Sequence, residues 1–331
     1  MLYILPGCGH HCPLGLLIQR PAVISVAFLG PPGTFTEEAL LGQDDLVGSE
    51  LVPLATIREV LMATHAGRVD LGFVPMENSI EGTVLATLDN LVFDTELLIQ
   101  REVVLDVHLH LLAPPGTAVA DVRQVVSYPH ASAQCRAFLA RELPDAEVVA
   151  ANSTADAARQ LGQERLAGTA ALAPRLAGQL YGLDVLAAEV EDHPDNQTRF
   201  VLVAKRGIPM PTGHDRTSIV CFQRSDQPGS LHTILGQFSA RGINLTKLES
   251  RPTKRALGDY CFIIDMEGHV ADAVVTDCLR DLFAGLPGVK FLGSYPAAGV
   301  TGPARRRDAE AAWAAADAWV SVLRGQIGSR G

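Results

Sequence analysis

Residues 206–215 have the sequence RGIPMPTGHD, and this stretch divides the chain into two regions with different patterns. Its two prolines and two glycines interrupt both helical and strand periodicity, which is typical of a linker between domains. The full chain has 331 residues, which is long enough for two domains. We therefore expect a linker at 206–215 with one domain on each side of it.

The region before the linker alternates short apolar runs with helix-like stretches from Val23 onward. Few Asn-Gly or Asp-Gly hairpin signals separate these runs, which favours parallel βα units. The sequence therefore predicts α/β architecture up to about residue 205. The clearest expected strands are 24–29, 70–74, 125–128 and 200–203, and the expected helices are 36–41, 57–65, 84–91, 131–141, 153–161 and 174–180.

The region after the linker has a different order of elements. Strands are expected at 218–222, 244–250, 260–266 and 290–293, and helices at 231–240 and 271–282. This βαββαβ order is that of the split-βαβ, ferredoxin-like arrangement. An Ala-rich amphipathic helix follows at 304–323, and we expect it to pack on its own protein. The expected divisions are a disordered leader at 1–22, a first domain at 23–205, the linker, a second domain at 216–297 and a helical tail at 298–331.

Composition limits the classes of partner. With 47% hydrophobic residues, 19% charged residues and a net charge of −10, the chain resembles a globular protein that does not bind nucleic acid, because phosphates would be repelled. Its six cysteines are scattered, as in proteins of a reducing cytoplasm. No export signal or membrane anchor is expected. In the leader, CGHHC at 8–12 crowds four ligands too closely to surround one ion, so no metal site is expected.

Polar residues follow two of the expected strands. The stretch GPPGTFTEEA at 30–39 offers Thr34 or Thr36 as a helix N-cap, and such a helix start can also hold an anion. The stretch VPMENSIEGTV at 74–84 places Asn78 and Ser79 at the end of another strand. Turn and capping roles account for both stretches without a ligand. However, open α/β sheets bind ligands at the carboxyl ends of their strands, so a site is also expected here.

The stretch EDHPDNQTRF at 191–200 allows two interpretations. Asn196-Gln197-Thr198 matches a glycosylation sequon, but the expected cytoplasmic location argues against a sugar. The alternative is polar chemistry at the mouth of a buried strand. In a strand, Thr198 shares a face with Phe200 while Arg199 points away. Thr198 and Arg199 can therefore reach the same ligand only if the chain is still a loop at Thr198.

Taken in order, these stretches resemble the bacterial prephenate dehydratase family. The resemblance rests on GPPGTFTEEA, VPMENSIEGTV, SYPHASAQC at 127–135, NSTADAAR at 152–159 and NQTRF at 196–200, followed by PGSL at 228–231 and ESRP at 249–252. It implies a two-lobed catalytic domain of the type II periplasmic-binding-protein kind with a cleft between the lobes. A ferredoxin-like ACT domain would follow, and in the family this domain binds phenylalanine at a subunit interface.

The resemblance implies the conversion of prephenate to phenylpyruvate with loss of water and carbon dioxide, in phenylalanine biosynthesis. This chemistry requires no redox cofactor or metal. Thr198 would be the catalytic residue, as a hydrogen-bond donor to the departing oxygen. The implied substrate-binding residues are Thr34, Asn78, Ser79, Thr83, Arg199 and Phe200. The implied residues of the allosteric L-phenylalanine site are Gly229, Ser230, Leu231, Asn244, Glu249, Ser250, Arg251 and Pro252. A homodimer or homotetramer is expected.

The chain departs from the family pattern at two places. Many relatives have Ser-His-Pro-Gln where residues 127–130 are Ser-Tyr-Pro-His, so a catalytic histidine at the second position is not expected here. PGSL also replaces the common Gly-Ala-Leu. Two alternatives to the dehydratase remain. One is an arogenate dehydratase, and the other is a non-catalytic, two-lobed module that binds prephenate or an amino acid.

Overall fold

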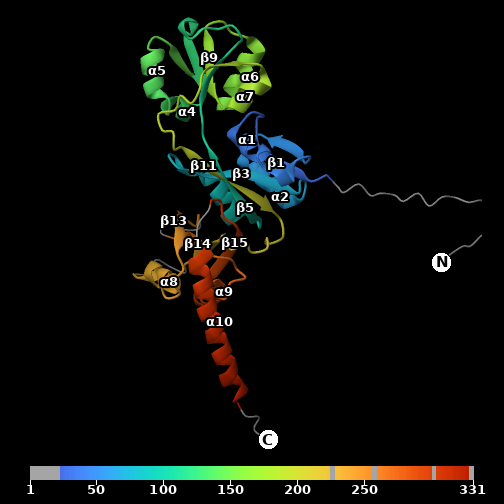
Figure 1. Cartoon of the computed structure of the whole chain (residues 1–331), viewed down its shortest axis with the longest axis vertical. Helices are drawn as coiled ribbons and strands as arrows, with labels where there is room; N and C mark the ends of the chain where they lie inside the picture. Colours follow the sequence, from blue (N-terminus) through green and yellow to red (C-terminus); the bar gives the residue numbers. More distant parts are fainter. Residues whose placement is uncertain (1–22, 224–227, 255–258, 300–302, 328–331) are drawn as a thin grey trace, which may run out of the picture.

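A computed structural model describes residues 23–223, 228–254, 259–299 and 303–327, with the side chains of 303–312 left out. Three β-sheets follow one another along the longest axis, and a helix extends beyond the last of them (Figure 1). The leader at 1–22, with its CGHHC motif, lies outside the described residues. Among the described residues, no helix is both long enough and apolar enough to span a membrane.

The first sheet forms the middle of the molecule and has the strand order β2-β1-β3-β11-β5, with β4 paired to β3. β1 runs parallel to β2 and β3, whereas β11 runs antiparallel to β3 and β5. The chain thus reaches β11 only after it has built the second lobe. The strands are β1 (Ser25–Leu29), β2 (Glu50–Leu54), β3 (Leu71–Asn78), β4 (Gly82–Thr83), β5 (Leu98–Asp106) and β11 (Gln197–Ala204). The helices are α1 (Phe35–Leu41), α2 (Ile57–Ala66) and α3 (Leu85–Asp89), with a short 3-10 helix η1 (Asp44–Leu46) and a short π-helix η2 (Asn90–Asp94).

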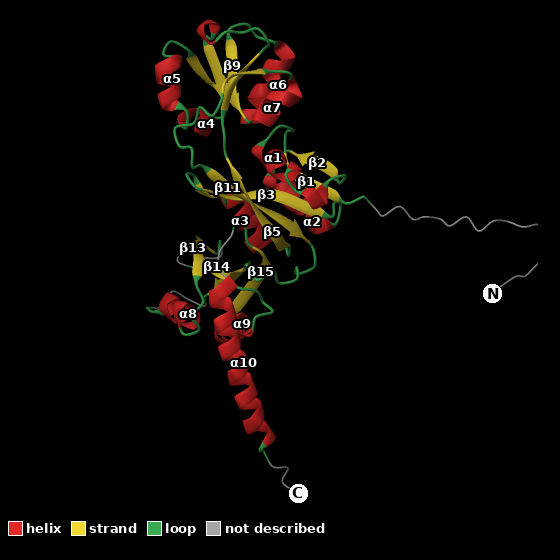
Figure 2. Ribbon diagram, viewed as in Figure 1, coloured by secondary structure: helices red, strands yellow, loops and turns green. Residues whose placement is uncertain are grey.

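The second sheet has the order β10-β6-β9-β7-β8 and forms the second lobe (Figure 2). β7, β8 and β9 are parallel, while β6 and β10 are antiparallel to their neighbours. The expected helix at 131–141 is two helices, because the chain breaks at Gln134 and Cys135. The elements are β6 (His110–Ala113), β7 (Gln124–Ser127), β8 (Glu147–Ala150), β9 (Thr169–Ala173), β10 (Asp184–Ala187), η3 (Val119–Asp121), α4 (Pro129–Ala133), α5 (Arg136–Glu142), α6 (Thr154–Glu164) and α7 (Arg175–Tyr181).

The third sheet belongs to the C-terminal domain and has the order β13-β14-β12-β15. The element order is the βαββαβ arrangement that the sequence predicted, so the fold of this region is confirmed. By contrast, the expectation of parallel units before residue 205 is only partly correct, since both lobes have mixed sheets. The elements are β12 (Asp215–Phe222), α8 (Ser230–Ser239), β13 (Leu245–Pro252), β14 (Tyr260–Glu267), α9 (Ala273–Gly285) and β15 (Gly288–Pro296).

The C-terminal sheet is covered on both faces. One face packs on α8 and α9 through residues such as Phe262 and Ile264. The other face packs on the first lobe, where Cys261 and Ile263 share a buried cluster with Val201 of β11. Strand alternation explains the division, because successive residues of β14 point to opposite faces. The first lobe and the C-terminal domain therefore have a common apolar core.

The last helix, α10 (Pro303–Gly325), contacts α9 and then extends away from the rest of the chain (Figure 1). Trp319 is 63% exposed, and Val322 and Leu323 are exposed as well. The expectation that this helix packs on its own protein is therefore wrong for its C-terminal half. The amphipathic pattern predicted an apolar face but could not indicate how much of that face the chain itself covers.

Candidate active site

Thr198 lies in β11, at the edge of the first lobe that faces the second. The strand begins at Gln197, and Thr198 is paired with Asn78 of β3. The Asn78 side-chain amide donates to the Thr198 hydroxyl oxygen at 2.9 Å. Within the described part of the chain, this is the one hydrogen bond of that hydroxyl. Because the oxygen accepts from Asn78, the hydroxyl hydrogen is free to be donated to a ligand.

A local turn fixes the orientation of Asn78. Its side-chain oxygen accepts from the backbone N–H groups of Ile80 and Glu81, both at 2.9 Å. This is an Asx-type turn, in which an asparagine side chain takes the place of a backbone acceptor. The amide nitrogen is then directed at Thr198 and at the Asn196 side-chain oxygen, which is 2.8 Å away. The sequence around Asn78 therefore sets the geometry around the Thr198 hydroxyl.

Asn196 connects the two lobes. Its side-chain oxygen accepts from Asn78, and its amide nitrogen donates to the Gln134 side chain at 3.1 Å. Gln134 in turn donates to Glu81 at 3.3 Å. Asn196 is only 1% exposed, so its side chain is an internal hydrogen-bonding group and is not accessible as a sugar acceptor. The sequon interpretation is therefore wrong for this position.

Two further contacts join the lobes beside these amides. The His130 ring lies 2.8 Å from a Glu81 carboxylate oxygen, and the Tyr128 ring stacks on it with centroids 5.3 Å apart. On the other flank, the Tyr181 hydroxyl donates to the Pro32 carbonyl at 2.6 Å. Ligand sites often lie at the junction of two lobes, which is where these contacts are found.

The chain crosses between the lobes twice, and the two crossings are bonded to each other. The Glu191 carboxylate binds the His108 ring at 2.8 Å and accepts from the Leu109 N–H at 2.9 Å. The hydrogen bond to Glu191 raises the pKa of His108, although partial burial opposes the shift. This pair therefore holds together the two crossing segments, which we call the hinge.

Two of the expected substrate-binding residues, Thr34 and Ser79, make hydrogen bonds within the first lobe. Thr34 caps α1, because it accepts from the Glu37 N–H at 3.3 Å and donates its hydroxyl hydrogen to the Leu29 carbonyl at 3.0 Å. The Ser79 hydroxyl oxygen accepts from the Gln197 N–H at 2.9 Å and lies 3.4 Å from the Asn196 side-chain oxygen. Thr34 is thus committed to a cap, whereas Ser79 lies beside Thr198 and is exposed.

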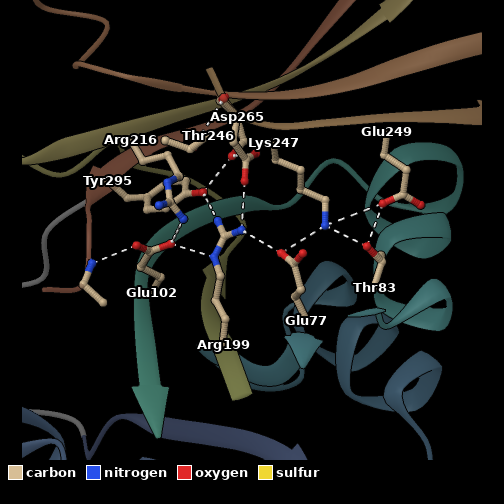
Figure 3. A network of polar contacts seen from close by, with 12 residues as sticks. Glu77, Thr83, Glu102, Arg199, Arg216, Thr246, Lys247, Glu249, Asp265 and Tyr295 are labelled. Carbon is tan, nitrogen blue, oxygen red and sulfur yellow. Dashed lines mark hydrogen bonds and ion pairs between the residues drawn. The ribbon is translucent and has the colours of Figure 1, made fainter. Parts of the chain in front are cut away.

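Three other expected substrate contacts do not agree with the geometry. Because the chain is already a strand at Thr198, Arg199 points to the opposite face, toward the C-terminal domain (Figure 3). Thr83 lies on that face too, where it donates to Glu249 at 2.7 Å. Phe200 is buried and stacks on Phe73 with centroids 5.4 Å apart, so it is a core residue.

Sequence reasoning missed Asn196, Gln134 and Glu81 as site residues. The sequence places Asn196 in the sequon and in the NQTRF stretch without a role of its own, and it places Gln134 in the middle of the expected helix at 131–141. The structure ends α4 just before Gln134, which frees this side chain to face the first lobe. One signal was available in the sequence. A polar glutamine directly before a cysteine, inside an otherwise apolar helical pattern, could have indicated a side chain that faces the site. Cys135 itself is buried, which raises the pKa of its thiol to about 12 and keeps it protonated.

The C-terminal domain contains a separate cavity of about 690 Å³, whose wall includes Gly229, Ser230, Leu231 and Ser250. Gly229 has φ = 86° and is the N-cap of α8, so the first N–H groups of a ten-residue helix lie beside this cavity. The other residues expected here lie elsewhere. Glu249 and Arg251 point to the first lobe, Asn244 donates to Glu267 at 2.9 Å, and Pro252 ends β13. Among the described residues, no cluster suits a metal ion.

Comparisons with known proteins match both regions of the chain. The prephenate dehydratase family model matches residues 26–208, and the ACT domain model matches residues 217–284. A prephenate dehydratase of Mycolicibacterium vanbaalenii is 43% identical over 303 residues, which cover 87% of this chain and 96% of that protein. Together these matches span both regions that the linker separates.

Solved structures that are similar to this chain include a prephenate dehydratase as well. The crystal structure of a prephenate dehydratase from Arthrobacter aurescens in complex with L-Phe is 40% identical, has a TM-score of 0.82 and covers 91% of this chain and all 100% of that one. A structure described as a novel type of quorum quenching acylase is 30% identical, has a TM-score of 0.74 and covers 83% and 98%. A shared fold does not by itself fix an activity, so function must be argued from the site. With both family models matched in order, the chain belongs to the prephenate dehydratase family.

Proposed function

We propose that this protein is a carbon–oxygen lyase that converts prephenate to phenylpyruvate, and that Thr198 is its catalytic residue. The observation that carries the proposal is the Thr198 hydroxyl, which accepts from Asn78 and has its own hydrogen free at the junction of the lobes. The exposed Ser79 hydroxyl lies beside it, and the Asn78 amide that holds Thr198 is fixed by its own turn. Such fixed, neutral donors suit a substrate that carries two carboxylates.

The proposed reaction balances with one proton taken up. The bond between the ring and its carboxylate breaks, and carbon dioxide leaves. The electron pair of the broken carbon–carbon bond forms a ring double bond. The C4–oxygen bond breaks, and the oxygen leaves as water. Thr198 donates a hydrogen bond to the departing oxygen and stabilises the charge that develops on it. An alcohol is too weak an acid to give up its proton completely, so the proton comes finally from solvent.

Paired substitutions of Thr198 test this role. Thr198→Val keeps the shape of the side chain and removes the donor, so kcat should fall about 10²- to 10⁴-fold. Thr198→Ser retains the hydroxyl and should keep most of the activity. Conversion of prephenate is followed by formation of phenylpyruvate without added cofactor, and circular dichroism checks folding. Turnover of Thr198→Val at the wild-type rate would disprove the proposed role.

The C-terminal cavity is the proposed site of feedback inhibition by L-phenylalanine. The N–H groups at the start of α8 would bind its carboxylate, and the apolar wall around Leu231 and Phe262 would hold its ring. Gly229→Val should weaken inhibition strongly, because valine is strained at φ = 86°. Ser250→Ala should weaken it less. Titration calorimetry with phenylalanine measures both effects, and unchanged affinity in both variants would exclude this cavity.

Several finer points stay proposals. The proposed divisions are 23–205 for the catalytic domain and 216–297 for the ACT domain, and limited proteolysis at 206–215 would test them. A homodimer or homotetramer is proposed, which light scattering measures. The substrate is proposed to be prephenate, and a higher kcat/KM for arogenate would reassign it. A cytoplasmic location is also proposed, supported by the scattered cysteines.

A further inference from the structure

β11 of the first lobe and β13 of the ACT domain lie on either side of the interface between these two parts, and in each strand alternate side chains point to opposite faces. In β11, Thr198 faces the junction of the lobes and Arg199 faces the ACT domain. In β13, Ser250 faces the ligand cavity, while Lys247 and Glu249 face the first lobe. Because side chains alternate along a strand, each strand has a site on one face and an interdomain contact on the other. A layer of charged side chains fills the interface on the faces of the two strands that are turned away from these sites (Figure 3).

Arg199 is the centre of this layer. Its guanidinium donates to Glu102 at 2.6 Å, to Asp265 at 2.8 Å and to the Tyr295 hydroxyl at 2.8 Å. Asp265 and Tyr295 belong to the ACT sheet, and both are fully buried. The Arg199 side chain itself is 9% exposed. A planar guanidinium with three fixed acceptors has little freedom, so the backbone of β11 is held to the ACT sheet at this residue.

The same construction occurs on the neighbouring strand. Glu77 of β3 is paired with Arg199 in the sheet, just as Asn78 is paired with Thr198. The Lys247 ammonium of the ACT domain binds Glu77 at 3.1 Å and donates to Thr83 at 2.8 Å. Consequently each residue of the hydrogen-bonded pair Thr198–Asn78 has a chain neighbour that points to the opposite face of the sheet. These neighbours are Arg199 and Glu77, and both are bonded to the ACT sheet.

The backbone of β11 is irregular next to these side-chain contacts. The pairing of β11 with β3 shifts register between Arg199 and Phe200, so the regular ladder is interrupted next to the proposed catalytic residue. Residues 197–199 are therefore offset from the rest of the β3 ladder, while they stay paired with β5 in regular register. The contacts of Arg199 act on this end of the strand.

We propose that Arg199 is a positioning residue of the dehydratase site, through which the ACT sheet sets the place of the Thr198 hydroxyl. This inference rests on the proposed function. Arg199 touches no substrate in this scheme and acts only through β11. Lys247 and Glu77 position Asn78 in the same manner. A ligand that displaces β13 from its cavity side changes these contacts without entering the active site.

Variants on both sides of the interface test the proposal. Arg199→Lys keeps the positive charge but removes the planar group that donates to Glu102, Asp265 and Tyr295. Asp265→Asn weakens one of these three contacts. For Arg199→Lys, kcat for prephenate should fall between about tenfold and hundredfold while KM changes less than about twofold. The double variant should lose little more than Arg199→Lys alone, because both changes release the same contact. Losses that multiply in the double variant, or an unchanged kcat in Arg199→Lys, would overturn it.

A matched control separates positioning from general loosening of the interface. Lys290 of β15 also joins the two domains, since it donates to the carbonyl oxygens of Val92 and Thr95 at 3.1 and 2.5 Å, but it lies away from β11. Lys290→Met should leave kcat within about twofold of wild type. A loss as large as that of Arg199→Lys would mean that any loosening of the interface has the same effect, and the special role of Arg199 would be refuted.

Hydrogen exchange supplies a readout that does not depend on turnover. In Arg199→Lys, the amides of residues 197–200 should exchange at least about tenfold faster than in wild type, and in Lys290→Met they should not. If wild-type protein turns over no prephenate, the proposed function fails while this measurement still decides the structural part. If Arg199→Lys does not fold, Tyr295→Phe replaces it, because it removes a single hydroxyl. Unchanged exchange at 197–200 in the tested variant would overturn the proposal.

Discussion

The first lobe meets its two neighbours in different ways. Toward the second lobe it uses amide hydrogen bonds such as Asn196–Gln134 and a half-exposed pair between Glu81 and His130. Toward the ACT domain it uses buried ion pairs around Arg199 and a shared apolar core. Exposed pairs stabilise by about 0–1 kcal/mol, whereas breaking a buried pair costs about 3–5 kcal/mol. We therefore expect the first interface to separate more readily than the second.

The strongest test of this contrast is to remove a buried carboxylate. Glu102 accepts from both Arg199 and Arg216 at 2.6 Å and is 7% exposed. Glu102→Ala leaves two guanidinium groups without this partner, so the free energy of unfolding should fall by about 3–5 kcal/mol, as measured by urea denaturation.

The neighbouring residue of the same strand offers the control. Arg101 pairs with Asp45 at the surface, where the Asp45 side chain is 60% exposed. Asp45→Ala should change the free energy of unfolding by at most about 1 kcal/mol. Equal losses in Glu102→Ala and Asp45→Ala would remove the distinction between buried and exposed pairs in this region.

A second test concerns the amide contacts between the lobes. Asn196→Ala removes one acceptor of the Asn78 amide and the donor to the Gln134 side-chain oxygen, so stability should fall by about 1–3 kcal/mol. The Asn78 amide also loses one of the contacts that direct it at the Thr198 hydroxyl, so kcat should fall about tenfold. Thermal unfolding and prephenate turnover measure the two effects. A variant with lower stability and full kcat would show that Asn196 is purely structural.

A smaller effect is expected at the opposite flank of the lobe junction. Tyr181→Phe removes the hydrogen bond to the Pro32 carbonyl, which should cost about 1 kcal/mol. Because this contact favours closed lobes, the substrate should bind more weakly, and KM should rise more than kcat falls. Steady-state kinetics separates the two constants. A fall in kcat with unchanged KM would place Tyr181 in the chemical step instead.

The smallest expected effect is a pH dependence at the hinge. The pKa of His108 is raised above its ordinary value of 6.5 by its hydrogen bond to Glu191. The resulting stability is therefore fully present below about pH 6.5 and is lost as pH rises through the higher folded-state pKa. The unfolding midpoint should decline over that window in wild type and less so in His108→Asn. Identical pH profiles would mean that this pair does not stabilise the hinge.

The sequence predicted the parts of the fold that carry clear periodicity. The order βαββαβ after residue 215 and the strands around residues 25, 71 and 200 were visible because apolar runs were bounded by turn residues. Besides the two-residue β4, six strands of the two lobes were not among the expected ones: β2, β5, β6, β8, β9 and β10. Length alone does not explain this, because the nine-residue β5 was missed while the four-residue β7 was expected. The break at Gln134 was missed because no proline or glycine marks it.

For the site, the sequence alone determined that Thr198 and Arg199 point apart if both lie in one strand, since alternation is a local property of the backbone. It also determined the turn and capping chemistry around Asn78 and Thr34. What Arg199 meets on its own face was decided only by tertiary structure. Its partner Asp265 is 66 residues away in sequence. Contacts at that separation depend on how sheets pack, and no local pattern encodes them. The same holds for Asn196, whose bond to Asn78 spans 118 residues and turns an apparent sequon into an internal contact.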